Sequence, residues 1–181
     1  LELADTVAFC EKFGYELIIV ESNLDSFLRE FFGRWGFNRT HTYRNLGITM
    51  LLQKGINKYY YSSAFNLSEF MFVLNTDAAK YEKWLLRHLG TGNITFYNSN
   101  QSWSRIEKVA RMIEVEESYD YLNVCLVDHI NCGVCTKCKR TLMELDAFGD
   151  DVLERYRNSF DIDTYRTKYR PLWFADIWKD M

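Results

Sequence analysis

Apolar positions along the chain switch between helical spacing and short continuous runs. Apolar side chains that recur every three or four residues are typical of amphipathic helices. This spacing predicts helices over residues 3–13, 24–32, 42–54, 81–89, 106–113 and 136–148, with a loop over 33–39. A glycine often follows the last helical residue, and Gly14, Gly55, Gly90 and Gly149 are the expected stops of four of these helices. Expected N-caps are Asn23 or Ser22, Asp77, and Ser102 or Ser104.

Short apolar or aromatic runs between these helices predict four strands, over residues 17–20, 58–62, 94–97 and 121–125. Strands that alternate with helices are typical of an α/β domain with a mostly parallel sheet. We therefore expect one α/β domain, a mostly parallel sheet flanked by helices, over residues 1–149, and a helical extension over 150–181. Pro171 is expected to open a last aromatic helix, which packs on the core or contacts a second copy in a homodimer.

Composition narrows the class of protein. A hydrophobic content of 48% and an aromatic content of 17% suffice for a substantial core, and a single proline argues against linkers. The net charge of −3 provides no basic field to attract nucleic acid. No apolar run reaches the roughly 18 residues of a membrane span, and no signal peptide is evident. Without a signal peptide, reduced cysteines that are free to bind metal favour the cytoplasm. The chain starts at Leu1, inside an expected helix, so we expect a piece of a longer protein.

Four of the five cysteines form the pattern C-x6-C-x2-C-x2-C. A C-x2-C step turns two thiolates toward one point, and four such ligands complete a tetrahedral zinc site. The pattern predicts a structural Zn²⁺ ion held by Cys125, Cys132, Cys135 and Cys138. Cys10 stands apart at an apolar helix position, where a buried core thiol is expected.

Other uses of these cysteines remain open. Disulfides need an oxidising compartment and would leave one cysteine over. An iron–sulfur cluster is the main rival, since C-x2-C-x2-C also serves clusters, but ferredoxins continue with Cys-Pro where this chain has Cys138-Lys139. His129 could replace one sulfur ligand.

Polar and basic residues at expected element ends suggest a substrate or nucleotide site. Ligands of parallel α/β sheets lie outside the carboxyl ends of strands, where Ser62 and Ser63 follow an expected strand. Donors at helix starts can bind carboxylate or phosphate, or can simply be solvated. The candidates there are Arg44, Asn45, Ser104, Arg105 and Lys108. No residue is predicted to be catalytic.

Several motifs along residues 1–149 together resemble the C-terminal part of N-type ATP pyrophosphatases. The motifs are Tyr43-Arg44-Asn45, Ser104-Arg105-x-Glu107-Lys108 and, most specifically, Asn131-Cys132-Gly133-x-Cys135-x-Lys137-Cys138-x-Arg140-Thr141. The 7-cyano-7-deazaguanine synthase family is the most similar branch, and its four cysteines hold a structural zinc beside the active site. The first cysteine gap is six residues here and longer in that family, which points to a relative of it.

The resemblance implies an enzyme that uses ATP and Mg²⁺ to adenylate a small-molecule substrate, with release of pyrophosphate. A nitrogen nucleophile then displaces AMP in amide- or nitrile-forming chemistry. These enzymes hold phosphate with a Ser-Gly-Gly-x-Asp-Ser loop, which these 181 residues lack, so this chain alone is not expected to turn over ATP. The alternative functions are a zinc-stabilised, non-catalytic binding or scaffold module, and an iron–sulfur protein.

Overall fold

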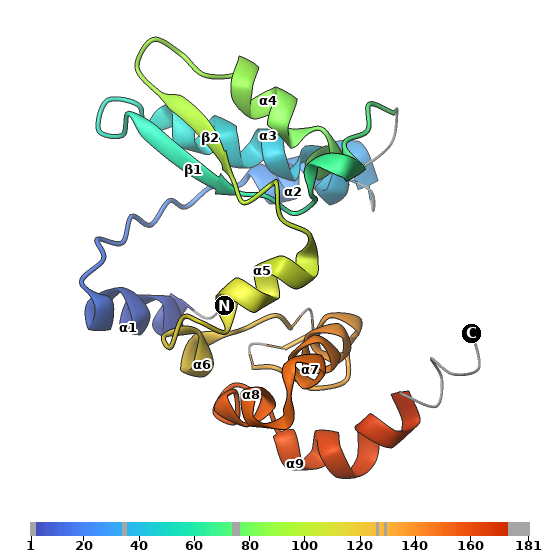
Figure 1. The fold of residues 1–181 in the computed structure, drawn as a ribbon. Helices are drawn as coiled ribbons and strands as arrows, with labels where there is room; N and C mark the ends of the chain where they lie inside the picture. Colours follow the sequence, from blue (N-terminus) through green and yellow to red (C-terminus); the bar gives the residue numbers. More distant parts are fainter. Residues whose placement is uncertain (1–2, 34–35, 74–76, 126, 129, 174–181) are drawn as a thin grey trace. The chain divides into compact units, whose positions relative to one another are not determined.

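The computed structural model describes residues 3–33, 36–73, 77–125, 127–128 and 130–173. The chain divides into two compact units. One comprises residues 18–105 and is called the sheet unit here; the other comprises residues 1–17 with 106–181 and is called the cysteine unit. Both are rich in helix, and the strands belong to the sheet unit (Figure 1).

The sheet unit combines helices with two parallel strands. Its elements are α2 (Leu24–Phe32), α3 (Gly36–Leu51), β1 (Lys58–Ser62), the 3₁₀ turns η2 (Leu67–Glu69) and η3 (Ala78–Lys80), α4 (Glu82–His88) and β2 (Thr95–Ser99). Strands β1 and β2 pair in parallel, with Tyr59 opposite Phe96 and Tyr61 opposite Asn98.

Alternation along the strands gives the sheet two different faces. Tyr59 and Phe96 point to the face where α3 and α4 pack, and Leu46, Leu85 and Ile94 complete this core. On the opposite face, Tyr60 and Tyr97 stack with ring centroids 5.1 Å apart and are 65% and 41% exposed. The two aromatic strands therefore form a sheet with one buried side.

The cysteine unit is helical. It contains α1 (Leu3–Phe13), most of α5 (Arg105–Met112), α6 (Ser118–Tyr121), α7 (Thr136–Phe148), α8 (Asp150–Arg155), α9 (Ile162–Thr164) and a π-helical turn, η4 (Tyr165–Tyr169). The core gathers side chains from α7, α8 and the segment after it, including Cys138, Leu142, Leu153, Tyr156 and Tyr165. Helix α1 contributes Phe9, whose ring meets Tyr121 at 5.2 Å.

Most predicted helices and two predicted strands are confirmed. Helices α1, α2 and α7 and strand β1 have the predicted bounds, while β2 begins at Thr95 rather than Ile94. Gly14 follows α1 with φ of 71° and Gly149 follows α7 with φ of 129°, a region that favours glycine. Trp173 is 8% exposed and packs in the core, as expected for the tail. Phe174 and Trp178 lie outside the described residues.

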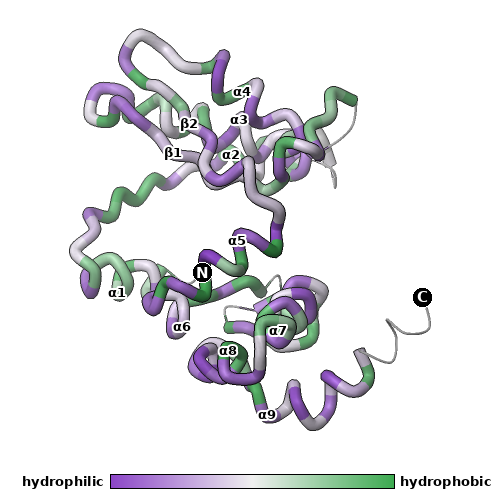
Figure 2. The backbone as a smooth tube through the Cα atoms, viewed as in Figure 1, coloured by the Kyte–Doolittle hydropathy of each residue, from purple (hydrophilic) through white to green (hydrophobic). Residues whose placement is uncertain are grey.

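The predicted strand over residues 17–20 is wrong. These residues have no regular secondary structure, and Ile18, Ile19 and Val20 are 53%, 56% and 41% exposed. Figure 2 shows the run as a hydrophobic stretch between α1 and α2. An apolar run becomes a buried strand only where a neighbour pairs with its backbone. Within the described residues the ladder joins β1 to β2 alone.

The predicted strand over residues 121–125 is also wrong, and a side chain explains why. Tyr121 ends α6, and the backbone after it is bound by Asn131. The Asn131 amide donates to the Leu122 carbonyl at 2.7 Å, and its oxygen accepts from the Val124 N–H at 2.9 Å. A mostly parallel sheet of four strands is therefore replaced by a pair of strands with helices.

Smaller departures have local causes. Helix α3 begins at Gly36, inside the predicted loop. Asn23 occupies the N-cap position of α2 without a side-chain cap bond, whereas the Asp77 carboxylate accepts from the Ala79 N–H and caps η3. Pro171 does not open a helix but continues one, just after the π-helical turn. Cys10 was expected to be a buried core thiol but is half-buried, and α1 contains no fully buried residue.

No helix in the described part of the chain is long and apolar enough to span a bilayer.

Candidate metal centre

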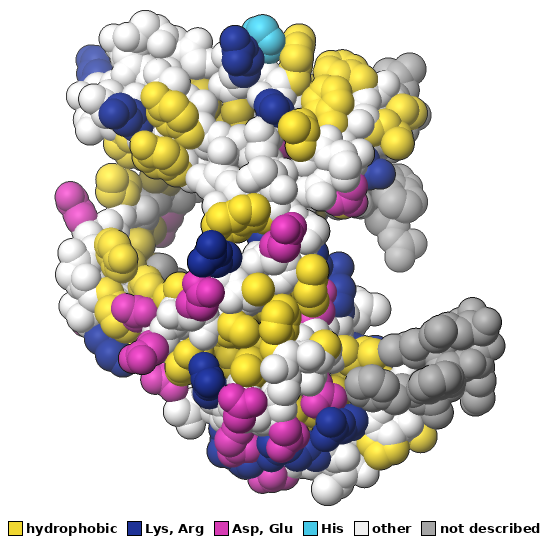
Figure 3. Space-filling view, viewed as in Figure 1, with side chains coloured by type: hydrophobic (Ala, Val, Ile, Leu, Met, Phe, Trp, Pro, Cys, Tyr) yellow, Lys and Arg dark blue, Asp and Glu magenta, His cyan; other side chains and the backbone are white. Residues whose placement is uncertain are grey.

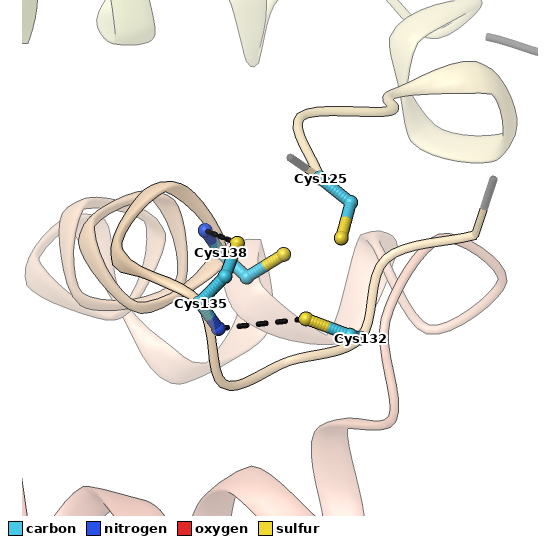
Figure 4. A group of neighbouring side chains, drawn as sticks. All are labelled: Cys125, Cys132, Cys135 and Cys138. Atoms are coloured by element: carbon cyan, nitrogen blue, oxygen red, sulfur yellow. Dashed lines mark hydrogen bonds between the residues drawn. The ribbon is translucent and has the colours of Figure 1, made fainter. Parts of the chain in front are cut away.

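The structure brings the four clustered cysteines together. Their Sγ atoms all lie within 4.8 Å of one another. Figure 4 shows the four side chains turned toward one another, from the loop after α6 and from the start of α7. Around a tetrahedral Zn²⁺ with bonds of about 2.3 Å, sulfurs stand about 3.8 Å apart. A small contraction of the observed group therefore suffices to hold one ion.

Local structure explains how three of the sulfurs converge. Cys135 is the N-cap of α7 and Cys138 lies in its first turn, so both side chains reach the same end of the helix. Gly133 has φ of 74°, which turns the chain between Cys132 and Cys135 in a conformation that L side chains rarely adopt. Glycine in the Cys132-Gly133-x-Cys135 motif thus permits the turn that places the Cys132 side chain beside the start of α7.

Backbone N–H groups point at these sulfurs. The Cys125 Sγ accepts from the N–H groups of Val127 and Asp128 at 3.4 and 3.3 Å. The Cys132 Sγ accepts from Cys135 N–H at 3.4 Å, and the Cys135 Sγ accepts from Cys138 N–H at 3.5 Å. Such donors, and the positive end of the α7 dipole, stabilise the thiolate form that binds metal.

The surroundings move two of the thiol pKa values in opposite directions. The N–H groups of Cys132, Val127 and Asp128 lower the pKa of Cys125 to about 6. Burial raises the pKa of the Cys138 thiol to about 12, because Cys138 is 0% exposed. A cation at the centre of the group would favour the thiolate form of both.

Asn131 supports the cysteine loop from behind. Besides binding the backbone of residues 122 and 124, its amide donates to the Ser159 carbonyl at 2.9 Å. Its Oδ1 also lies 3.9 Å from the Cys138 Sγ. One side chain therefore ties the loop that carries Cys125 to the segment after α8. Residues in such a position fix the orientation of metal ligands.

The other predicted site residues are spread over the sheet unit and its boundary. Arg44 and Asn45, predicted at a helix start, lie in the middle of α3, because this helix begins at Gly36. The Asn45 amide donates to the Tyr61 hydroxyl at 3.4 Å. Ser62 ends β1, and the N–H of Ser63 donates to the Ser99 carbonyl at 3.2 Å. Ser104 and Arg105 close the sheet unit, whereas Lys108 belongs to the cysteine unit. Their role in binding remains a prediction, and His129 lies outside the described residues.

Sequence reasoning missed a polar group in the sheet unit centred on His41. Its Nε2 is 2.8 Å from the Asp77 carboxylate, and its Nδ1 is 3.4 Å from the hydroxyls of Tyr61 and Thr42. Burial raises the pKa of Tyr61. These residues lie on three elements far apart in sequence, so spacing gave no signal for them.

Comparisons of the chain with protein-family models, with curated proteins and with solved structures found no match.

Proposed function

We propose that Cys125, Cys132, Cys135 and Cys138 bind one Zn²⁺ ion as a structural centre. The observation that carries this proposal is the approach of all four Sγ atoms to within 4.8 Å of one another. Backbone N–H groups directed at three of the sulfurs add support, because they favour thiolates.

A single ion fits this spacing better than a four-iron cluster. Each thiolate of such a cluster binds a different iron, so the four sulfurs stand further apart than around one ion. Four thiolates also fill the tetrahedral positions of zinc, which leaves none for water or substrate. The ion would therefore cross-link the cysteine loop to α7 and take no part in a reaction.

Metal content and optical absorption test this proposal on the purified full chain. We expect about one zinc per chain, no visible absorption, and unfolding of the cysteine unit on chelation. Cys138→Ser should lose most of the zinc, while Cys10→Ser, which removes a half-buried thiol outside the cluster, should keep it. Iron with visible absorption, or equal zinc in Cys138→Ser and the parent, would contradict the proposal.

We further propose that the chain belongs to an ATP-dependent adenylating enzyme of the pyrophosphatase type. Support comes from the motif around the cysteines and from the parallel pair β1–β2, whose carboxyl ends carry Ser62, Ser63 and Ser99. In this proposal ATP, Mg²⁺ and a small-molecule substrate of the deazapurine carboxylate class meet near these ends, in the reducing cytoplasm. Arg44, Asn45, Ser104 and Arg105, which all belong to the sheet unit, would supply donors to anionic groups.

Pyrophosphate release tests the enzymatic proposal separately from the zinc centre. The protein expressed from its natural gene should release pyrophosphate from ATP and Mg²⁺ when supplied with a 7-deazapurine carboxylate. Arg105→Gln should reduce that rate, whereas Lys54→Gln should not. Zinc binding without any ATP binding or pyrophosphate release would favour a zinc-stabilised binding module.

A further inference from the structure

A groove runs between α2 and α3 of the sheet unit. Its volume is about 530 Å³, within the range of pockets that hold small organic molecules. Leu24 and Leu28 form one wall, one turn apart on α2. Arg39, Tyr43 and Gly47 stand at successive turns of α3 and form the other, with Thr40 and Arg44 beside them. The opposite side of α3 is occupied by the core, where Leu46 and Thr49 are buried.

Gly47 keeps the groove open. A Cβ atom built on Gly47 meets no atom within 4 Å, so the space beside this helical glycine is empty. Glycine in the middle of a helix is less favourable than alanine, and α3 carries it on the wall of the groove. A larger side chain at residue 47 would therefore occupy the groove, and its Cβ atom would not clash with neighbouring atoms.

The described lining of the groove carries positive charge. Among the described residues that line it, two are arginines and none is acidic. Arg44, which lines the groove, also has its guanidinium 5.2 Å from the centroid of the Phe37 ring. The walls themselves are carbon, from two leucines and a tyrosine ring. Guanidinium groups pair with carboxylate, sulfonate and phosphate, while leucine and tyrosine surfaces favour apolar carbon.

We propose that the groove between α2 and α3 binds a small amphipathic anion. The apolar part of the ligand lies between Leu24, Leu28 and Tyr43, and its acid group meets Arg39 and Arg44. This site is separate from the zinc centre, because all its residues belong to the sheet unit. It shares Arg44 with the proposed donors to ATP and substrate, but it is defined by the groove alone.

Fluorescence titration of the full chain with 8-anilinonaphthalene-1-sulfonate tests the proposal, because this dye joins an aromatic body to one anion. We expect saturable binding and displacement by octanoate or octyl phosphate, with octanol at least tenfold weaker. The better of the two anions identifies the acid group. Equal displacement by octanol, or no displacement by either anion, would overturn the proposal.

Two pairs of variants locate the site. Gly47→Phe should abolish displaceable dye binding, whereas Asn38→Phe should not, because Asn38 lies about 180° around the helix from residue 47. Arg39→Gln with Arg44→Gln should weaken octanoate at least tenfold and leave octanol unchanged. Lys54→Gln with Lys58→Gln removes the same charge from exposed positions and should change neither.

Folding and self-association are measured on the same samples. Gly47→Ala and Gly47→Phe should keep the parent circular dichroism, and Gly47→Ala should raise the melting temperature, as an Ala-for-Gly change in a helix does. If Gly47→Phe does not fold, the arginine pair decides the proposal alone. Unchanged dye binding in these variants would overturn it. Self-association is detected as a molecular mass that rises with protein concentration. If the parent self-associates and both Gly47→Ala and the double arginine variant do not, the groove binds a second copy of the chain rather than a small anion.

Discussion

Asp146 shows how the cysteine unit buries a charge. Its side chain is 1% exposed, and its Oδ2 accepts from the Tyr165 hydroxyl and from the Arg170 guanidinium, each at 3.0 Å. Its Oδ1 has no hydrogen-bond partner among the residues described. Burial and the neighbouring carboxylate raise the pKa of Tyr165. The carboxylate thus depends on these two hydrogen bonds, because at 1% exposure water cannot take the place of either partner.

Replacing Asp146 should be costly. We expect Asp146→Ala to lower the free energy of unfolding by about 2–4 kcal/mol, because it leaves the buried Tyr165 hydroxyl without its acceptor. Asp151→Ala, whose side chain is 76% exposed, should change it by less than about 0.5 kcal/mol. Denaturant titration followed by circular dichroism compares the two, and equal losses would contradict the role of burial.

Acid should reveal a second residue, Glu154. Hydrogen bonds from Arg157 and Arg166 lower its pKa from 4.5 to about 2. A lowered folded-state pKa stabilises the protein above the unfolded value, and this contribution is lost as pH falls from about 4.5 toward 2. The melting temperatures of the parent and Glu154→Gln should therefore differ at pH 6, approach each other below pH 4.5 and converge only near pH 2. A gap that stays constant with pH would show that the glutamate charge is not involved.

These charges belong to a wider surface pattern. Arg166 also binds Asp150 at 2.8 Å, and Arg157 binds Asp163 at 2.7 Å. Figure 3 shows acidic and basic side chains interspersed over this end of the cysteine unit. Exposed pairs of this kind are individually weak and are screened by salt, so the buried Asp146 matters more to stability.

At the scale of the element, residue spacing predicted those helices, strands and clusters whose formation depends on residues close together in the sequence. Helix α7 and strand β1 have the bounds expected from their apolar periods, and the four cysteines meet because a short loop and one helix turn carry them. Residues 17–20 and 121–125 have the composition of strands, but their state depends on distant partners. The run at 121–125 is held by Asn131, and the His41 group joins three elements. Such contacts leave no local period in the sequence.

The 3₁₀ turn η3 offers a test of such a tertiary contact. Asp77 caps it through the Ala79 N–H at 2.9 Å and also binds His41 of α3 at 2.8 Å. Asp77→Ala should therefore destabilise the sheet unit by about 1–2 kcal/mol. Asp77→Asn should retain most of that stability, because its amide oxygen can still accept the capping bond. Thermal unfolding of both variants gives the comparison, and equal losses would assign the effect to the carboxylate charge.

At the scale of the whole molecule, two separate cores predict two separate responses to metal removal. Cys138 lies inside the core of the cysteine unit, whereas the core of the sheet unit contains Leu46, Leu85 and Phe96. Chelation should therefore increase hydrogen exchange over residues 106–173 and leave α3, β1 and β2 protected. Peptide-level mass spectrometry before and after chelation reads both units at once. Loss of protection in the sheet unit at the same chelator concentration would contradict this independence.

The path of the chain through the two units has a consequence for its synthesis. The cysteine unit takes α1 from one end of the described chain and most of α5, with α6 to η4, from the other, and residues 18–105 are inserted between them. On the ribosome, the whole sheet unit emerges before Cys125, and the last thiol emerges only with Cys138. The Phe9 ring of α1 can therefore contact its neighbours Phe13 and Tyr15 at once, but not the ring of Tyr121, while the entire sheet unit is synthesised. Its partner Tyr121 arrives more than a hundred residues later.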